Sequence, residues 1–370
     1  MLTRRNHPLA CTIAMASALP VLPLPTRAEE PPPVDPPAPS RASSFLDSLW
    51  DAPTLYQNDD HPFLKQFKFT GRYHGQFAAV DSDQGNSDEW ENRRMRLGAS
   101  ARFFRDITFS AAVDIDDHFD PSYKNLDTAS FTAPLTDFLS IELGKHKPRW
   151  SHEASTSSKR LLTIERSLLV NQVRPLEATG FSASGSHGHW SYQAGVFSGN
   201  VDDEFGDLSG GSLFLLSLGY EFPAFLGLGP APWRLDYLHT DPEPGDSAAA
   251  PYEHAFATSL TVGKDRLHCI GELIFASGMS PDAYGINLIP YYDITEKLQV
   301  VTRYQYATSD NNGLRLQKRY ERAAPLLTDG GRGDRYHAFY TGLNYQLRGH
   351  KLKLMAGTEW ATMDGGGDGG

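Results

Sequence analysis

The stretch that decides the fold is FKFTGRYHGQF, residues 67–77. Aromatic residues and glycines occupy its odd positions, and polar residues occupy its even positions. A repeat of two residues is typical of a β-strand whose two faces differ, because successive side chains point to opposite sides. We therefore expect one face of this strand to lie against lipid and the other against water.

Similar segments follow along the rest of the chain. We count about fifteen, most of them near the roughly 9 to 11 residues that a tilted strand needs to cross a bilayer. They lie near residues 67–77, 94–103, 107–116, 125–132, 138–145, 178–185, 189–197, 212–222, 232–239, 254–263, 266–277, 283–291, 297–308, 334–347 and 350–362. Short connections such as Lys264-Asp265 alternate unevenly with long polar ones such as 309–333. The sequence therefore predicts an all-β protein, a transmembrane antiparallel β-barrel.

A soluble β-sandwich or β-propeller is the competing interpretation, because its strands also alternate. The polar positions here are densely charged on successive strands, which favours a face in contact with water. Aromatic residues near segment ends also match the girdles that barrels place at the lipid headgroups. These residues are Tyr291, Tyr292, Tyr304, Tyr306, Tyr336, Tyr340 and Trp360.

The N-terminus has the features of a secretory signal peptide. Arg4 and Arg5 precede a mostly apolar stretch, and small residues near its end predict cleavage after Ala28. A retained membrane helix is the alternative, but the apolar part is short and broken by prolines. We assign residues 1–28 to a signal peptide, 29–64 to a proline-rich periplasmic lead-in and 65–370 to the barrel domain.

Charge and cysteine content exclude other classes of protein. The net charge of -11 argues against a general nucleic-acid-binding protein, so no nucleic-acid partner is expected. The mature chain keeps only Cys269, so an internal disulfide cannot stabilise it. Closed strand pairing would stabilise an exported chain instead.

Arginines gather on the polar face of the first two predicted strands. Arg72 and His74 belong to the first, and the second carries Arg94, Arg96 and Arg102. A column of guanidinium groups in a lumen would attract anions, because the planar fork can donate two hydrogen bonds to a phosphate or carboxylate. The alternative is that these arginines pair with Asp114, Asp116 or Glu142 and brace the wall.

A second basic tract, GKHKPRW, covers residues 144–150 and begins a long connection without clean alternation. Its basic residues, with those that follow, are Lys145, Lys147, Arg149, Lys159, Arg160 and Arg166. A loop of this length could fold into the pore, where its charges would set selectivity. The alternative is an outer loop that meets lipopolysaccharide or solvent.

Several of these motifs together resemble the phosphate-selective porin O and P family. The resemblance rests on ENRRMRLG at 91–98, GKHKP at 144–148, ERS at 165–167, TGF at 179–181 and YQAGVFSGN at 192–200. In the family these occur in the same order, as an arginine-rich second strand, a strand end, the loop after it and the next hairpin. The layout matches over roughly residues 65–362.

The resemblance implies an outer-membrane barrel of about 16 strands, a homotrimer with an inward-folded third loop and basic residues that guide small anions such as phosphate. Outer-membrane lipid and lipopolysaccharide would surround it. A non-selective or structural barrel without anion preference remains the alternative. Such barrels usually end on a strand with a terminal aromatic residue, whereas here residues 363–370 are glycine-rich, so we expect a missing last strand or another mode of closure.

An outer-membrane barrel enzyme is the main rival from another class. It would need a nucleophile with a base in reach, but none of the histidines lies in a recognisable triad motif. Ser182 and Ser184 lie in an ordinary strand and not in a G-x-S-x-G turn. We therefore expect a channel and no catalytic residue.

Metal and cofactor motifs are weak. The acidic run from Asp114 to Asp120 lacks the glycine and the distal glutamate of a calcium loop. His187 and His189 flank a turn glycine without a third zinc ligand. The sequence predicts no metal site and no cofactor.

Overall fold

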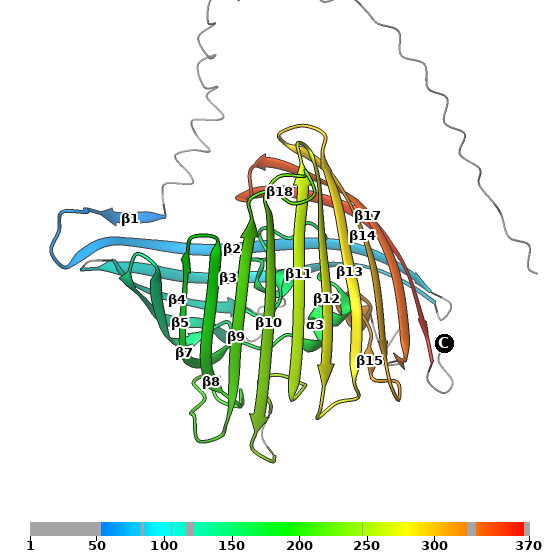
Figure 1. The fold of residues 1–370 in the computed structure, drawn as a ribbon, viewed down its shortest axis with the longest axis horizontal. Helices are drawn as coiled ribbons and strands as arrows, with labels where there is room; N and C mark the ends of the chain where they lie inside the picture. The colour runs from blue at the N-terminus through cyan, green and yellow to red at the C-terminus, as the bar shows by residue number, and fades with distance from the viewer. Residues whose placement is uncertain are drawn as a thin grey trace, which may run out of the picture. The chain divides into compact units, whose positions relative to one another are not determined.

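Sixteen antiparallel strands form one sheet that follows the order of the chain, with each strand hydrogen-bonded to the next (Figure 1). The strands are β1 (Thr54–Gln57), β2 (Leu64–Ser82), β3 (Gly85–Phe103), β4 (Ile107–Ile115), β5 (Tyr123–Thr136), β6 (Leu139–His146), β7 (Ala178–His187), β8 (Trp190–Ser198), β9 (Gly211–Phe222), β10 (Ala231–Pro242), β11 (His254–Lys264), β12 (Leu267–Ser277), β13 (Ala283–Asp293), β14 (Leu298–Ser309), β17 (Arg335–Arg348) and β18 (Leu352–Asp364). A separate pair joins β15 (Leu314–Arg315) to β16 (Arg332–Gly333).

This computed structural model describes residues 53–82, 85–104, 106–115, 122–245, 247–323 and 331–365. They belong to one compact unit, Trp50–Gly370. The predicted signal peptide, most of the lead-in and Asp116 lie outside the described residues.

All fifteen segments predicted from alternation are strands, and they correspond to β2–β14, β17 and β18. Alternation did not predict β1, which pairs through Thr54 and Gln57 with Lys68 and Gln66 of β2. The sheet therefore begins within the stretch that we assigned to the lead-in. Among the described residues, β1 and β18 are the first and last strands of the sheet order.

The outward face of the sheet is apolar. On β2 and β3 the large side chains Phe69, Tyr73, Phe77 and Leu97 are each more than half exposed. So many exposed aromatic and aliphatic side chains are typical of a surface in contact with lipid, where apolar side chains carry no free-energy penalty of hydration. The buried positions of the same sheet include many charged and amide side chains, the reverse of a soluble core.

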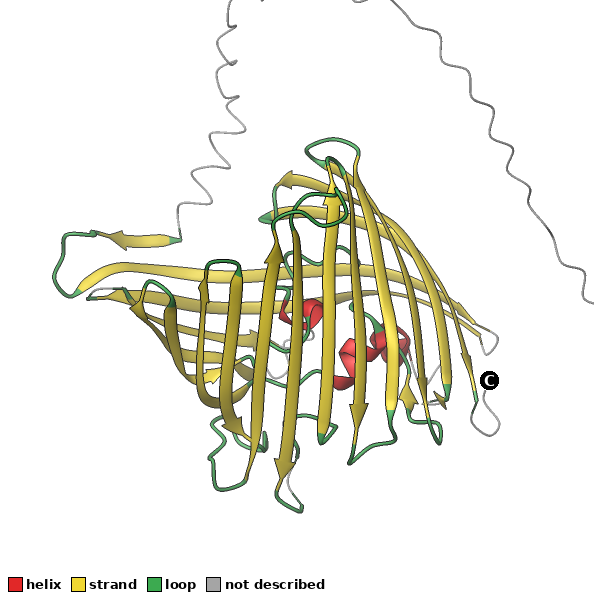
Figure 2. Cartoon of the chain, viewed as in Figure 1, coloured by secondary structure: helices red, strands yellow, loops and turns green. Residues whose placement is uncertain are grey.

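The connections differ in length at the two ends of the strands. Short turns follow β3, β5, β7, β11, β13 and β17, whereas the longest connections follow β6 and β14. The connection after β6 contains α2 (His152–Ser155) and α3 (Leu168–Val173), and the one after β14 contains α4 (Lys318–Ala323). Figure 2 shows these helices within the curve of the sheet.

None of the described helices is long and apolar enough to cross a membrane.

Apolar side chains anchor the connection after β6, residues 147–177, to the inner wall. Trp150, Leu168 and Val170 are fully buried or nearly so and join one hydrophobic cluster with Phe197 and Leu215 of the sheet. Burial of such side chains stabilises by about 1.5 to 3 kcal/mol each. The segment, called the inner loop below, is thus held inside the sheet along one side.

Candidate functional site

The inner loop crosses from one part of the sheet to another. His152 N donates to Glu272 of β12, Leu168 N donates to Gln305 of β14, and Lys353 of β18 donates to Leu161 O. These strands lie on the wall to which the apolar cluster also belongs. The expectation that this loop folds inward is therefore met by its hydrogen bonds.

On the opposite side, a bulge in β3 aims two neighbouring arginines at the inner loop. His74 of β2 faces Arg94, whereas the next residue, Gly75, faces Asn92, so Arg93 is an extra residue in the ladder. Arg93 Nε lies 2.7 Å from Glu165 Oε1, and Arg94 Nη2 lies 4.0 Å from Glu165 Oε2. A bulge lets adjacent residues reach the same side, which strict alternation forbids.

Helix α4 brings two more arginines to the same place. Arg319 Nη1 lies 3.0 Å from Glu91 Oε1, and Arg322 lies 2.8 Å from Glu91 and 2.6 Å from Glu165. We call Arg93, Arg94, Arg319 and Arg322, with Glu91 and Glu165, the arginine cluster. Four guanidinium groups meet two carboxylates, so the cluster carries a formal charge of +2.

Glu165 is ionised in this cluster. Burial alone would raise its pKa, but Arg93 and Arg322 outweigh burial and hold the pKa at about 2. The carboxylate is therefore a permanent negative charge at any physiological pH. It links the inner loop to β3 and to α4 at once.

Two basic residues of the inner loop have only neutral partners. Lys147 Nζ donates to Ala154 O at 2.5 Å, and Arg166 donates to Glu153 O and Thr156 O. Burial and neighbouring cations lower the pKa of Lys147 to about 7 and that of Arg166 to about 10. Within the described part of the chain, no carboxylate lies within ion-pair distance of either side chain.

A second ionic contact fixes the inner loop to the wall. Arg303 of β14 is buried, and its guanidinium lies 2.7 Å from Glu359 of β18 and 3.6 Å from Glu153 of the loop. Its Nη1 also donates to Thr163 Oγ1 and to Glu165 O. Arg303 is thus the main polar link between the loop and β14.

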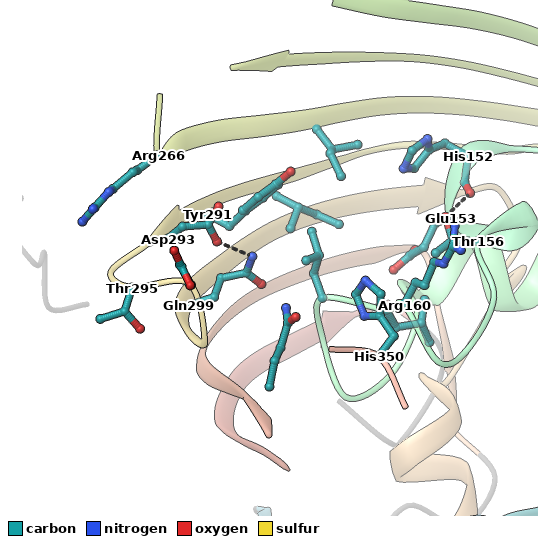
Figure 3. Close-up of a pocket in the computed structure, with 16 residues that line it drawn as sticks. His152, Glu153, Thr156, Arg160, Arg266, Tyr291, Asp293, Thr295, Gln299 and His350 are labelled. Atoms are coloured by element: carbon teal, nitrogen blue, oxygen red, sulfur yellow. Dashed lines mark hydrogen bonds between the residues drawn. The ribbon is translucent and has the colours of Figure 1, made fainter. Parts of the chain in front are cut away.

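The inner loop also borders a cavity of about 600 Å³ at the end of the strands that carries the short turns (Figure 3). Arg160 and His350 lie on one side of it, and Tyr291 and Asp293 lie on the other. Gln299 Nε2 donates to Asp293 Oδ1 at 2.8 Å. Charged, amide and apolar residues all line the cavity, as in a water-filled vestibule.

The sequence-predicted residues fall into two groups. Besides Arg94, which shares Glu165 with the other arginines of the cluster, four of them pair with carboxylates: Arg96 with Asp114 and Asp127, Arg102 with Asp59 and Asp106, Lys145 with Glu204, and Arg149 with Glu142. These contacts agree with the alternative in which the basic residues pair with carboxylates and stabilise the barrel wall. Arg149 is also half exposed, so it does not join the buried basic residues.

The other group stays close to the inner loop. Arg72 donates to the hydroxyls of Ser157 and Ser158, and Arg160 borders the cavity. Burial, Arg72 and Arg96 lower the pKa of Lys159. With Arg94, Lys147 and Arg166, these residues form the basic set that the fold brings near the loop.

Three arginines of the cluster were missed from the sequence. Arg93 is on the lipid parity of its strand, and only the bulge turns it inward. Arg319 and Arg322 lie about 230 residues from Glu91 in the chain, in a connection that shows no alternation. The doublet Arg93-Arg94, which interrupts the period of two, was the one local signal.

Part of the chain matches a known protein family. Residues 67–230 match the family model of phosphate-selective porin O and P. Over these residues the chain is similar to that family. The chain has no significant match among curated protein sequences.

Solved structures share the fold of this chain at low sequence identity. An anion-selective porin from Comamonas acidovorans superposes with a TM-score of 0.58 at 12% identity, covering 80% of this chain and 89% of that one. Salmonella typhi OmpF gives a TM-score of 0.58 at 12% identity, covering 85% and 94%. A loop-deletion mutant of OmpT, an outer membrane protein of Vibrio cholerae, gives 0.52 at 12% identity, covering 80% and 94%.

Family and fold agree on the class of protein. The sixteen-stranded sheet, its apolar outer face and its polar interior are those of a transmembrane β-barrel. The chain is therefore an outer-membrane porin, and it resides in the bacterial outer membrane.

Proposed function

We propose that this porin conducts small anions, phosphate among them, in preference to cations, and that the arginine cluster and the basic set near the inner loop guide them. The observation that carries the proposal is the formal charge of +2 on a group of six side chains that are all less than a quarter exposed, the most exposed being at 24%. Charge that is partly shielded from water acts over a longer range than surface charge. An anion near the cluster would balance the positive charge that its two carboxylates leave uncompensated.

The chemistry of the cluster suits phosphate. Guanidinium groups donate paired hydrogen bonds to a tetrahedral oxyanion and cannot lose their charge in a protein. Arg94 is the member whose donor is furthest from its carboxylate, at 4.0 Å. We therefore assign Arg94 as the first contact for a passing anion.

Further basic residues would extend the path on both sides of the cluster. Lys147 and Arg166 have neutral backbone partners, and Arg72 has serine hydroxyls. Lys159 and Arg160 follow in the inner loop, and Arg160 borders the vestibule. Several weak sites in series allow an anion to enter and also to leave.

The remaining candidates are assigned to the wall. Arg96, Arg102, Lys145 and Arg149 each pair with at least one carboxylate, which cancels their charge. We expect their replacement to affect stability more than ion preference.

Three wider expectations belong to the same proposal. Residues 1–28 are removed on export, the residues between them and β1 form the periplasmic lead-in, and the barrel begins with β1 at Thr54. The porin assembles as a homotrimer, and its outer loops contact lipopolysaccharide. Similarity to outer-membrane porins such as OmpF supports an oligomer, and cross-linking of the purified protein tests the trimer.

The test is a planar-bilayer recording of the purified porin across a KCl gradient, repeated with added inorganic phosphate. We expect a reversal potential of the sign for anion preference and a current that phosphate reduces. Arg94→Ala should weaken both effects, and Lys147→Ala should weaken the first.

Arg149→Ala serves as the matched control, because Arg149 is exposed and paired. It should leave the reversal potential unchanged. A reversal potential near zero in the unmodified porin would support the non-selective alternative, and a folded barrel without conductance would support the structural one.

A further inference from the structure

Two histidines stack across neighbouring strands at the end of the barrel that carries the longer connections, which we call the outer rim. His239 of β10 faces His254 of β11, and their ring centroids lie 5.0 Å apart at an interplanar angle of 21°. Both share the outward parity of Leu235 and Phe256, which are exposed. The pair thus lies on the outer surface, next to the longer connection that joins the two strands.

A carboxylate completes the group. Glu253 Oε1 lies 3.4 Å from His254 Nε2, and one donor atom from each of His239, Glu253 and His254 lies within 4.8 Å of the others. Within the described residues, this is the one group of three such side chains whose donor atoms converge. The 3.4 Å contact is close to the edge of a tetrahedron around a metal with bonds of about 2.0 to 2.2 Å.

The backbone of Glu253 is held in place from two sides. Thr240 N donates to Glu253 O at 2.8 Å, and Glu253 N donates to Gly278 O at 3.2 Å. Gly278 has a φ of 74°, and a Cβ there would lie 2.7 Å from Glu253 Cβ. The carboxylate is therefore carried by a tethered residue and not by a free loop tip.

The ring nitrogens are disposed for ligation. Tyr237 Oη lies 3.0 Å from His254 Nδ1, and when Nδ1 donates to it, Nε2 keeps its lone pair and points toward Glu253. A polar group on the far nitrogen of a ligating histidine is the usual arrangement at metal sites. His239 Nδ1 is buried and has no hydrogen-bond partner in the structure, so a bound cation would satisfy it.

We propose that His239, Glu253 and His254 form a binding site for a divalent transition-metal ion of the Zn²⁺ type at the outer rim. Two imidazoles and one carboxylate are ligands that Zn²⁺ accepts, with a water in the fourth position, whereas Ca²⁺ and Mg²⁺ prefer oxygen ligands alone. Binding would tie β10, β11 and their connection together. The site is independent of the anion path, since none of its residues contacts the inner loop in the contacts described above.

The test is a Zn²⁺ titration of the folded full-length porin in detergent, in competition with a chromophoric chelator. We expect one Zn²⁺ per chain. His239→Ala, His254→Ala and Glu253→Gln should each weaken binding by about tenfold or more, and Tyr237→Phe should weaken it less than any of them.

His337→Ala is the matched control. Tyr304 Oη lies 3.0 Å from His337 Nδ1, so this pair repeats the Tyr237–His254 contact without belonging to a group of three. The control should bind Zn²⁺ as the unmodified porin does. Heat-modifiable gel mobility verifies that every variant is a folded barrel, and Glu253→Gln, which keeps the shape of the side chain, decides the matter if an alanine variant does not fold.

Absence of stoichiometric binding would overturn the proposal. Binding that all three ligand variants retain, or that His337→Ala removes, would overturn it as well. Added Ca²⁺ or Mg²⁺ at the same concentration should not displace Zn²⁺, and displacement would also contradict the proposed ligand chemistry.

Discussion

Arg93 Nε donates to Glu165 Oε1 across 2.7 Å, although the two residues are separated by 72 positions in the chain. This contact joins the bulge of β3 to the inner loop. It depends on a break in the alternation that otherwise governs the strand, since a regular strand would turn Arg93 toward lipid.

Arg93 and Arg94 should therefore differ when each is replaced by alanine. Arg93→Ala removes one of two arginines that donate to a buried carboxylate, and because Arg322 remains we expect a loss of about 1.5 to 3 kcal/mol. Arg94→Ala removes charge at a distance of 4.0 Å and should mainly reduce anion preference. Thermal unfolding followed by gel mobility measures the first effect and reversal potential the second. Equal losses of stability in both variants would contradict this division of roles.

Selectivity should depend on pH through Lys147. Burial, with Arg166 and Arg174 nearby, lowers the pKa of Lys147 to about 7, so the side chain is charged below this pH and neutral above it. We expect anion preference to fall as the pH rises from 6 to 8. Reversal potentials measured at these pH values test it.

Lys147→Arg is the control for that dependence, because a guanidinium keeps its proton throughout this range. The variant should hold its anion preference from pH 6 to pH 8. A pH dependence that survives in Lys147→Arg would assign the titration to another group.

Glu165 should stabilise the porin down to strongly acidic pH. Its pKa is about 2 in the folded protein, below the ordinary value of 4.5, so its contribution is fully present above the ordinary pKa. The contribution, about 3 kcal/mol, is lost as the pH falls through the folded pKa. Glu165→Gln should lower the unfolding temperature at pH 7, and the difference from the unmodified porin should shrink only below about pH 4. A difference that disappears already at pH 6 would contradict this account.

Replacement of Arg303 should release the inner loop. The side chain is 1% exposed and contacts Glu153 and Glu359, so Arg303→Ala would deprive two carboxylates of the cation that they share. We expect a loss of about 3 to 5 kcal/mol together with larger and noisier single-channel conductance. Arg303→Lys should retain part of the stability because it keeps one positive charge. Unchanged conductance in a folded Arg303→Ala barrel would show that the loop is held without this residue.

Trp150 offers an apolar counterpart to that experiment. Its side chain is fully buried in the cluster that fixes the inner loop to the wall. Trp150→Ala should cost about 3 to 5 kcal/mol through lost burial and a residual cavity. Conductance noise should rise as in Arg303→Ala, whereas ion preference should persist, because no charge is removed.

The strands and the class of protein followed from the sequence because their cause is local. Each strand that faces lipid on one side and water on the other repeats every two residues, and fifteen of the sixteen strands show this repeat. β1 was not predicted, because Thr54–Gln57 is too short to show a repeat of two residues. The basic tract near Lys147 was also evident, since lysine and arginine are concentrated in a connection.

The sequence by itself thus determined a membrane barrel, its outward face and the length of the connection after β6, because lipid and water act directly on every residue of a strand. Only the tertiary structure decided that this connection lies inside the sheet. Only the tertiary structure decided which cations stay uncompensated. Arg96 and Arg94 share one face of β3, yet Asp114 and Asp127 pair with Arg96 whereas Arg94 shares Glu165 with Arg93 and Arg322. The ion pairs depend on the bulge in β3 and on two connections, those after β6 and β14, which meet in space although they are far apart in the chain. The charge balance of such a cluster leaves no pattern in the local sequence.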